Sequence, residues 1–460
     1  MPFAFAPPSA AAVPVWLVHA GNWAETRAAV GEAAARFADA CGFEPKEGKL
    51  QCLPDAEGGL AAALFGVGDK DAKGRDPMAA GKLATALPAG TYRFANAPYE
   101  PALAALAFLL GLYRFERFRA EPAPRPLLVA PEGVDALRLE RIAAAVAFGR
   151  DLVNAPANAL GPAALEAEAA RLADQFGARF ETTVGEALLE RNLPLVHAVG
   201  RAAAEPPRLV DFVWGRADAP KVTLVGKGVV FDSGGLDVKP ASGMLLMKKD
   251  MGGAAAALAL ARLIMEAGLD LRLRVAIPIV ENAISGAAMR PGDVVRSRKG
   301  LAVEIGNTDA EGRLILADAL ALVDEEAPEL LFDFATLTGA ARVALGPDLP
   351  PFYTDDEALA AEIAAAATRV WDPLWRLPLW RPYEETLKSE VADLDNAPAG
   401  GFAGSVTAAL FLSRFVTSAK AWAHFDIYAW NPKARAHGPQ GGEVQAARAV
   451  FDLLEARRRR

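Results

Sequence analysis

The sequence predicts an α/β protein with a smaller N-terminal α/β domain, a linking helix, and a larger C-terminal domain built on a doubly wound, mostly parallel sheet. Three observations lead to this expectation. After residue 163, strand-like apolar runs alternate with helical stretches, which is typical of βαβ units. Four prolines in residues 121–131 and a helical run over 134–153 separate this region from the chain before it. With 460 residues, 52% of them hydrophobic, the chain can form two or three domains.

The N-terminal domain is expected to cover residues 1–130, and nothing in it carries recognisable chemistry. Its predicted elements are strands at 13–18 and 60–66, a helix at 24–40 and a buried helix at 102–113. The linking segment, 131–156, is mostly the helix at 134–153. This helix is expected to stop where Pro156 and Pro162 flank asparagine and glycine.

The C-terminal domain, 157–460, carries the alternating pattern. Predicted strands lie at 208–214, 222–225, 271–280 and 330–335, and predicted helices at 163–176, 254–267 and 313–326. In such sheets, ligands bind at the carboxyl ends of the strands. The acidic residues described below fall at those ends.

The composition excludes several classes of protein. The net charge of -8 predicts no general attraction to nucleic acid. Two cysteines, Cys41 and Cys52, are too few for a disulfide framework or a cysteine-type zinc site. The N-terminal stretch MPFAFAPPSAAAVP lacks the basic and apolar regions of a signal peptide, and the apolar run at 102–112 is too short to span a membrane. We therefore expect a cytoplasmic protein that does not bind membranes.

Two segments of the sequence contain a distinctive set of charged residues. The first, VTLVGKGVVFDSGGLDVKPASGMLLMKKD at 222–250, contains Lys227, Asp232, Lys239 and Asp250, and the second, NTDAEGRL at 307–314, contains Asp309, Glu311 and Arg313. Charges of this kind are buried only when they are paired or bind a metal. None of the four histidines lies in either segment, so a Ser/His/Asp or Cys/His site has no support there. Oxygen ligands with one or two nitrogen donors suit Zn, Mn, Co or Mg, and two ions sharing carboxylates account for so many acidic residues better than one ion.

These segments resemble the metal-binding signatures of the leucyl aminopeptidase family, the two-metal cytosolic aminopeptidases. The motifs VGKG-x3-DSGG, DMGGAA and NTDAEGRL stand in the family's order at 225–235, 250–255 and 307–314. An octapeptide that matches together with two other motifs is a highly specific signal. The resemblance runs over roughly residues 151–448.

The resemblance implies a pair of divalent ions, with Zn or Mn expected. Their implied ligands are Lys227, Asp232, Asp250, Asp309 and Glu311. Asp232 and Glu311 would bridge the ions, Lys227 and Asp250 would complete one site, and Asp309 would complete the other. A lysine ligand must be neutral, so the ions would have to depress its pKa by several units. Taken singly, each of these residues would be interpreted as a surface charge.

The resemblance also implies two catalytic residues that are not ligands. Lys239 would stabilise the oxyanion formed from the scissile carbonyl. Arg313 would bind a bicarbonate that acts as general base, because its planar fork suits an anion of carboxylate shape. An ion pair between Arg313 and a neighbouring carboxylate is the alternative. Lys248 and Lys249, which precede Asp250, are interpreted as solvated or structural.

The implied substrate-binding residues are Met247, Thr336, Leu337 and Gly339. For Met247, a place in the core is nearly as good an interpretation. An apolar pocket would favour leucine-like first residues, although such pockets discriminate weakly between similar side chains. His424 and Asp426 are interpreted as structural rather than catalytic. The resemblance alone implies a homohexamer, a dimer of trimers.

The leading hypothesis is therefore a two-metal aminopeptidase that removes N-terminal residues from peptides. A second hypothesis keeps the metals but changes the substrate to a phosphate or another amide. The absence of a P-loop and the lack of excess positive charge argue against phosphate. A third hypothesis, a DNA-binding or regulatory protein, is opposed by the net charge of -8 and by the absence of a basic stripe.

Overall fold

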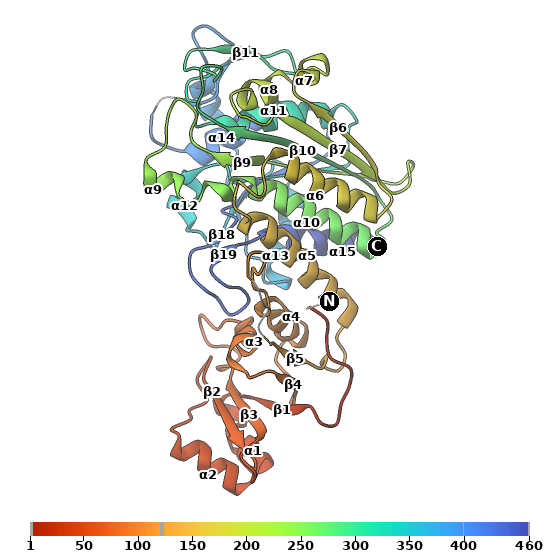
Figure 1. Cartoon of the computed structure of the whole chain (residues 1–460), viewed down its shortest axis with the longest axis vertical. Coiled ribbons are helices and arrows are strands. Elements are labelled where there is room, and N and C mark those ends of the chain that lie inside the picture. Colours follow the sequence, from red (N-terminus) through yellow and green to blue (C-terminus); the bar gives the residue numbers. More distant parts are fainter. Residues whose placement is uncertain (1–2, 120–123, 399, 459–460) are drawn as a thin grey trace. The chain divides into compact units, whose positions relative to one another are not determined.

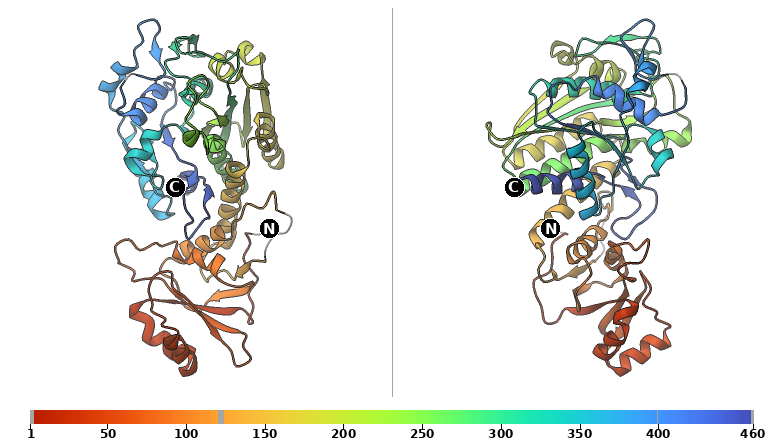
Figure 2. Two further views of the ribbon diagram at one scale, coloured as in Figure 1. Left: turned by 60° about the vertical axis from the view of Figure 1, so that its left-hand side comes forward. Right: turned by 180° about the vertical axis from the view of Figure 1, so that it is seen from behind.

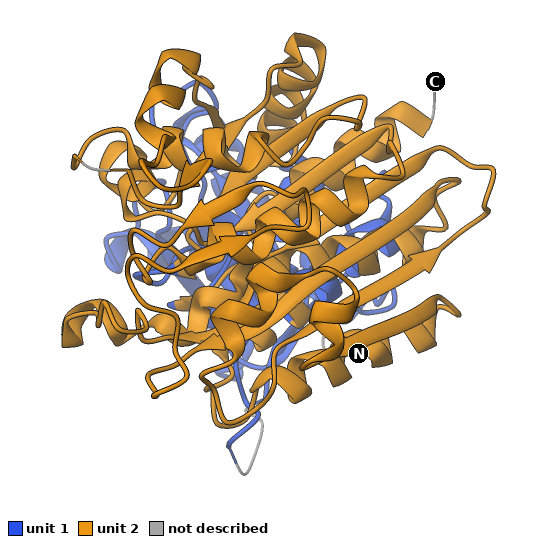
Figure 3. Ribbon diagram, turned by 90° about the horizontal axis from the view of Figure 1, so that it is seen from above, with its two compact units in different colours: residues 1–147, 431–440 blue, residues 148–430, 441–460 orange. Residues whose placement is uncertain are grey.

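The computed structural model describes residues 3–119, 124–398 and 400–458. The chain forms two compact units, which Figure 3 distinguishes by colour. The N-terminal unit contains residues 1–147 and 431–440, and the second unit contains residues 148–430 and 441–460. The sequence patterns gave no reason to group 431–440 with the N-terminal part. The domain limits at residues 130 and 156 remain a prediction.

The N-terminal unit is built on a five-stranded sheet in the order β2-β3-β1-β4-β5. The strands are β1 (Val13–Val18), β2 (Leu50–Pro54), β3 (Leu60–Gly66), β4 (Gly90–Phe94) and β5 (Pro126–Leu128). All neighbouring pairs are parallel except β2 with β3. The helices are α1 (Trp23–Val30), α2 (Glu32–Ala40), α3 (Leu83–Ala86), α4 (Pro101–Gly111), and the short 3-10 helices η1 (Ala20–Asn22) and η2 (Ala79–Lys82).

The single helix predicted at 24–40 is two helices, which corrects that expectation. Gly31 lies between α1 and α2 with φ of 88° and ψ of 158°, a conformation that only glycine adopts without strain. The helical periodicity of the sequence continues across this glycine, so periodicity alone could not reveal the break. The predicted linking helix is α5 (Ala136–Asn154).

The second unit is organised by a nine-stranded sheet, whose main order is β15-β14-β17-β13-β8-β10-β7-β6, with β9 also paired to β10. The strands are β6 (Arg179–Val184), β7 (Arg208–Trp214), β8 (Lys221–Gly226), β9 (Gly228–Asp232), β10 (Arg272–Asn282), β13 (Leu330–Ala335), β14 (Pro351–Tyr353), β15 (Trp375–Arg376) and β17 (Trp422–Asp426). The central strands β17, β13, β8 and β10 are parallel to one another. At one edge, β7 is antiparallel to β10, and β6 is antiparallel to β7. The mixed α/β fold with a mostly parallel sheet agrees with the predicted fold class.

Helices cover both faces of this sheet (Figures 1 and 2). The helices that lie wholly within the described part of this unit are α6 (Pro162–Gln175), α7 (Ala187–Glu190), α8 (Pro194–Gly200), α9 (Ala241–Met244), η3 (Met247–Met251), α10 (Gly252–Ala267), α11 (Glu311–Asp324), α12 (Gly339–Leu345), α13 (Glu357–Arg369), η4 (Arg381–Leu387), α14 (Gly404–Ser413) and α15 (Ala447–Arg458). Short strands outside the large sheet are β11 (Val294–Arg296), β12 (Ala302–Glu304), β16 (Leu394–Asp395), β18 (Trp430–Asn431) and β19 (Gly441–Gly442).

The core explains why the central strands are continuous apolar runs. A buried cluster joins α8, α11 and α14 to side chains of β8, β10 and β13 on one face, including Val225, Ala276 and Leu331. On α11 every residue is buried, including Glu311 and Arg313. Strands covered on both faces need apolar residues throughout. Within the described residues, no helix combines the length and the apolar character needed to cross a membrane.

Candidate metal centre

The charged residues of the two motifs come together at the carboxyl ends of the parallel strands. Lys227 directly follows β8, Asp232 ends β9, and Glu311 opens α11. Asp250 lies in η3, immediately before α10, and Thr336 directly follows β13. The sheet therefore places residues that are far apart in the sequence at one edge, as expected for a doubly wound fold.

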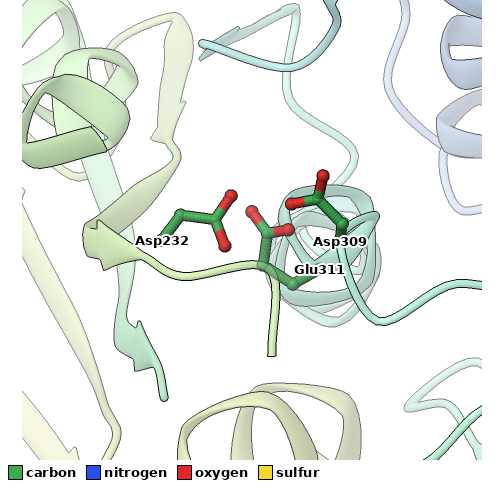
Figure 4. Close-up of side chains that lie close together, drawn as sticks. All are labelled: Asp232, Asp309 and Glu311. Carbon is green, nitrogen blue, oxygen red and sulfur yellow. The ribbon is translucent and has the colours of Figure 1, made fainter. Parts of the chain in front are cut away.

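Three of the carboxylates point toward one another (Figure 4). Asp232, Asp309 and Glu311 each offer one oxygen, and these oxygens all lie within 4.8 Å of one another. Asp232 and Glu311 are buried, whereas Asp309 is partly exposed. Carboxylates at such separations repel one another unless cations lie between or beside them.

Two lysines supply positive charge to this cluster. The Nζ atom of Lys227 lies 2.7 Å from Asp250 Oδ2 and 3.0 Å from Glu311 Oε1. The Nζ atom of Lys239 lies 2.7 Å from Asp232 Oδ2 and also contacts Asp309 Oδ1. Each lysine thus joins two of the four predicted acidic ligands, and the structure brings all six residues into one cluster.

The pKa values show that the lysines do not fully neutralise the cluster. Burial, followed by the charge of Asp232, raises the pKa of Glu311 to about 8 and the pKa of Asp309 to about 6. Burial alone would lower the pKa of Lys227, but the neighbouring carboxylates raise it above its ordinary value. In the absence of further cations, the carboxylates therefore cannot all ionise easily at neutral pH.

The donor set fits divalent cations. Asp250 Oδ2, Asp309 Oδ1 and Glu311 Oε1 are buried oxygens without a hydrogen bond of good geometry. Buried oxygens in this condition are costly unless a cation binds them. Several carboxylate oxygens and a lysine nitrogen suit Zn or Mn. The residues present are therefore able to hold metal ions.

Neutral groups around the cluster orient the carboxylates. Asn282 Nδ2 and the Gly234 N–H both donate to Asp232 Oδ1 at 2.9 Å, and Thr336 Oγ1 donates to Asp250 Oδ1 at 2.7 Å. Asn282 was not among the site residues expected from the sequence. The one feature that could have indicated Asn282 is its position just after the end of a predicted strand; in the structure, it pairs in register with Asp232. Such outer contacts fix the orientation of metal-binding side chains.

Arg313 lies beside the cluster with unused hydrogen-bonding capacity. Its Nη1 donates to the Asn396 carbonyl oxygen at 2.6 Å, while its Nε is buried without a partner. Burial lowers the pKa of Arg313 to about 10. Among the described residues, no carboxylate forms an ion pair with Arg313, so the alternative of a neighbouring ion pair is not observed. Asn396 was not identified from the sequence.

An open cavity of about 90 Å³ adjoins the cluster. All the predicted substrate-binding residues line it, namely Met247, Thr336, Leu337 and Gly339. Lys249 and Arg342 also line it, and neither was expected there from the sequence. Lys249 was interpreted as solvated or structural, but only 3% of it is exposed, and burial lowers its pKa to about 8. His424 is fully buried against Asp333, with 2.6 Å between His424 Nδ1 and Asp333 Oδ1, and does not line this cavity.

The fold and the site together are those of an α/β protein with a buried carboxylate and lysine cluster that is able to hold metal ions. Comparison with known families is specific: residues 147–450 match the "Cytosol aminopeptidase family, catalytic domain", and residues 13–131 match the "M17 aminopeptidase, N-terminal domain". The chain belongs to the cytosol aminopeptidase family.

Curated relatives support this assignment along most of their length. A "Probable cytosol aminopeptidase" of Nitratidesulfovibrio vulgaris is 44% identical over 367 residues, which cover 75% of this chain and 72% of the relative. Another relative with the same name, from Synechococcus sp. strain CC9902, is 38% identical over 444 residues, which cover 90% of this chain and 89% of the relative.

Solved structures share the fold of the whole chain. A cytosol aminopeptidase from Coxiella burnetii has a TM-score of 0.94 and 43% identity, covering 99% of each chain. The bottromycin maturation enzyme BotP in complex with Mn has a TM-score of 0.88 and 36% identity, covering 98% of this chain and 100% of that one. The predicted family and fold are thereby confirmed, and family membership supports a metal-dependent aminopeptidase.

Proposed function

We propose that this protein removes N-terminal residues from peptides by means of two divalent ions, with a preference for leucine-like first residues. The observation that carries the proposal is the convergence of Asp232, Asp309 and Glu311 on one point beside the cavity. The buried oxygens around that point are contacted by the ammonium groups of Lys227 and Lys239 but have no hydrogen bond of good geometry, and the family is one of aminopeptidases.

The proposed ligands are Lys227, Asp232, Asp250, Asp309 and Glu311. Asp232 and Glu311 are assigned to both ions, in keeping with their central and buried places in the cluster. When bound, Zn or Mn ions supply a Lewis acid and a water that is activated at neutral pH. The neighbour in complex with Mn supports the choice of metal.

The two lysines are assigned different tasks. The Lys227 Nζ donates to the Thr336 carbonyl oxygen at 3.0 Å, which fixes the direction of its side chain within the buried cluster. As a ligand, Lys227 must lose a proton. The neighbouring carboxylates raise its pKa, and the positive charge of bound ions would lower the pKa again. Lys239 is partly exposed toward the cavity, so its ammonium can donate to the carbonyl oxygen of the substrate and stabilise the oxyanion.

Arg313 is proposed to bind a bicarbonate. Its buried Nε has no partner in the described part of the chain, and its position on the first turn of α11 lies two residues from Glu311. A bicarbonate held by the guanidinium could accept a proton near the reacting groups. The proposed leucine-like preference is supported by Met247, Leu337 and Ile427, which are the large apolar side chains among the residues that line the cavity.

Two further proposals concern the protein as a whole. A homohexamer built as a dimer of trimers follows from the family resemblance alone. A cytoplasmic location is supported by the name of the relatives, "Probable cytosol aminopeptidase".

The proposed activity is tested with leucine 4-nitroanilide and its N-acetylated form, each incubated with the purified protein and Mn²⁺ or Zn²⁺. We expect release of nitroaniline from the free-amine substrate only, because an aminopeptidase recognises the free α-amino group. Equal turnover of the acetylated substrate would indicate an amidase or an endopeptidase. Hydrolysis of neither substrate, nor of other aminoacyl nitroanilides, would contradict the proposed function.

A further inference from the structure

Two cationic side chains that line the cavity beside the candidate metal centre lie over the same aromatic ring. The Nζ atom of Lys249 lies 4.7 Å from the centroid of the Tyr428 ring. The guanidinium carbon of Arg342 lies 4.6 Å from the same centroid. Lys249 is buried in η3, whereas Arg342 is exposed on α12. The pair therefore spans the cavity wall from its buried part to its mouth.

Among the described residues, neither cation forms an ion pair with a carboxylate. Each lies over the ring of Tyr428, whose face attracts a cation. The nearby carboxylate of Asp426 is already occupied by the Leu337 N–H and by the N–H and hydroxyl of Thr338. The charges of Asp250 and Asp426 act on Lys249, but neither carboxylate pairs with it directly, so its ammonium is available to an anion in the cavity.

The location of Lys249 indicates which part of a substrate could meet it. It stands between Met247, assigned to the pocket of the first residue, and Asp250, assigned as a metal ligand. An aminopeptidase cavity must end beyond the side chain of the first residue, because no residue precedes it. Lys249 lines the cavity and only 3% of it is exposed, and we assign it to this closed end. The remainder of the peptide leaves through the open side.

We propose that Lys249, assisted by Arg342, binds the side-chain carboxylate of an acidic first residue, so that peptides beginning with glutamate or aspartate are substrates. This inference rests on the proposed aminopeptidase function and names a second substrate class besides leucine-like residues. The side chains of Met247 and Leu337 contact the methylene groups of the acidic residue, and Lys249 and Arg342 bind its carboxylate. A charge-assisted hydrogen bond to a buried ammonium is among the stronger polar contacts in proteins.

The test compares glutamyl and glutaminyl 4-nitroanilides, which have the same shape and differ in charge. With the metal-loaded enzyme, we expect kcat/KM for the glutamyl substrate to exceed that for the glutaminyl substrate by about tenfold or more. In Lys249→Met, which keeps the length of the side chain, the ratio should fall to about one. In the control Lys420→Met, which removes an exposed lysine paired with Glu329 in the same unit, the ratio should be unchanged.

A second variant keeps the inference testable if Lys249→Met does not fold. Arg342 is exposed, so Arg342→Glu places no new charge in the core and should lower the ratio severalfold. A wild-type ratio at or below one, or a ratio that survives both substitutions, would overturn the inference. Leucyl nitroanilide distinguishes the proposed aminopeptidase activity from the proposed preference for acidic first residues. If the enzyme hydrolyses leucyl nitroanilide but does not prefer the glutamyl substrate to the glutaminyl one, only this inference is contradicted. Failure of all aminoacyl substrates contradicts the proposed function and this inference with it.

Discussion

At the scale of single residues, the candidate metal centre contains two lysines that have similar surroundings but different proposed roles. Lys227 is buried between Asp250 and Glu311, and Lys239 lies nearer the cavity between Asp232 and Asp309. Without ions, both act as counter-charges, and the carboxylates raise the pKa of each. The difference between a ligand and an oxyanion donor should therefore become visible only when metal content and rate are measured together.

The variants Lys227→Ala and Lys239→Ala are expected to fail differently. Lys227→Ala should lower the number or affinity of bound ions as well as the rate, because a nitrogen ligand is lost. Lys239→Ala should keep its metal and lose about 10²–10³ in kcat, as is typical of a missing oxyanion donor. Metal analysis of both purified variants, beside steady-state kinetics, provides the measurement.

Reversed results would show that the two roles are exchanged: loss of metal in Lys239→Ala with full occupancy in Lys227→Ala. If both variants hydrolyse substrate at the normal rate, the whole assignment of the site is wrong.

Much of the site at this scale was predictable, because its residues lie in contiguous motifs whose order matched a family. Asn282 and Lys249 were not found, for different physical reasons. Asn282 reaches Asp232 through strand pairing between β9 and β10, a long-range contact that leaves no local pattern. Lys249 stands next to Lys248 in the sequence, and two adjacent lysines are typical of a solvated surface; only the fold shows that one of them is buried.

At the scale of elements, the start of α10 holds the metal centre close to the sheet. A Cβ atom on Gly253 would lie 2.0 Å from the Phe334 carbonyl oxygen and 2.8 Å from the Lys227 backbone nitrogen. Glycine is thus required because helix and strands approach too closely for any side chain. The same close contact ties the positions of Lys227 and Asp250 together.

Substitution of Gly253 by alanine should destabilise the protein by about 1–3 kcal/mol through overpacking, and it should weaken metal binding by displacing Lys227. Gly286→Ala is a matched control, because a Cβ atom there meets nothing within 4 Å. Thermal unfolding of the metal-free proteins should give a lower Tm for Gly253→Ala only. Equal Tm values and equal metal affinities for the two variants would contradict the role given to this contact.

Helices and strands were predictable where their patterns were long and apolar. Strands β7 and β13 have the predicted bounds, whereas α11 begins at Glu311 rather than at residue 313. That shift places Glu311 in the first helical turn. The short edge strand β6 was missed because its sequence, RFETTV, is polar and largely exposed; it is defined by pairing with β7.

At the scale of the whole molecule, the sequence predicted two α/β parts and the family that unites them. It did not predict that residues 431–440 group with the N-terminal unit. This segment, NPKARAHGPQ, contains two prolines, one glycine and two charged residues and has no hydrophobic periodicity. Assignments of this kind depend on tertiary contacts that a local pattern does not encode.

The proposed hexamer is a property of this scale and has a direct measurement. The chain has a mass of 48.4 kDa, so light scattering should give a particle six times heavier at the concentration used for the assays. A fully active monomer would contradict the proposal without affecting the assignment of the metal centre, because all proposed ligands belong to one chain.

The central claim is that two metal ions held by the carboxylate and lysine cluster are required for peptide hydrolysis. The most direct test titrates verified metal-free protein with Mn²⁺ or Zn²⁺ while bound ions per chain and leucine nitroanilide turnover are measured in parallel. We predict no turnover in the metal-free protein and full turnover when two ions are bound per chain. Full activity without metal, or saturation of activity at one bound ion, would contradict the account.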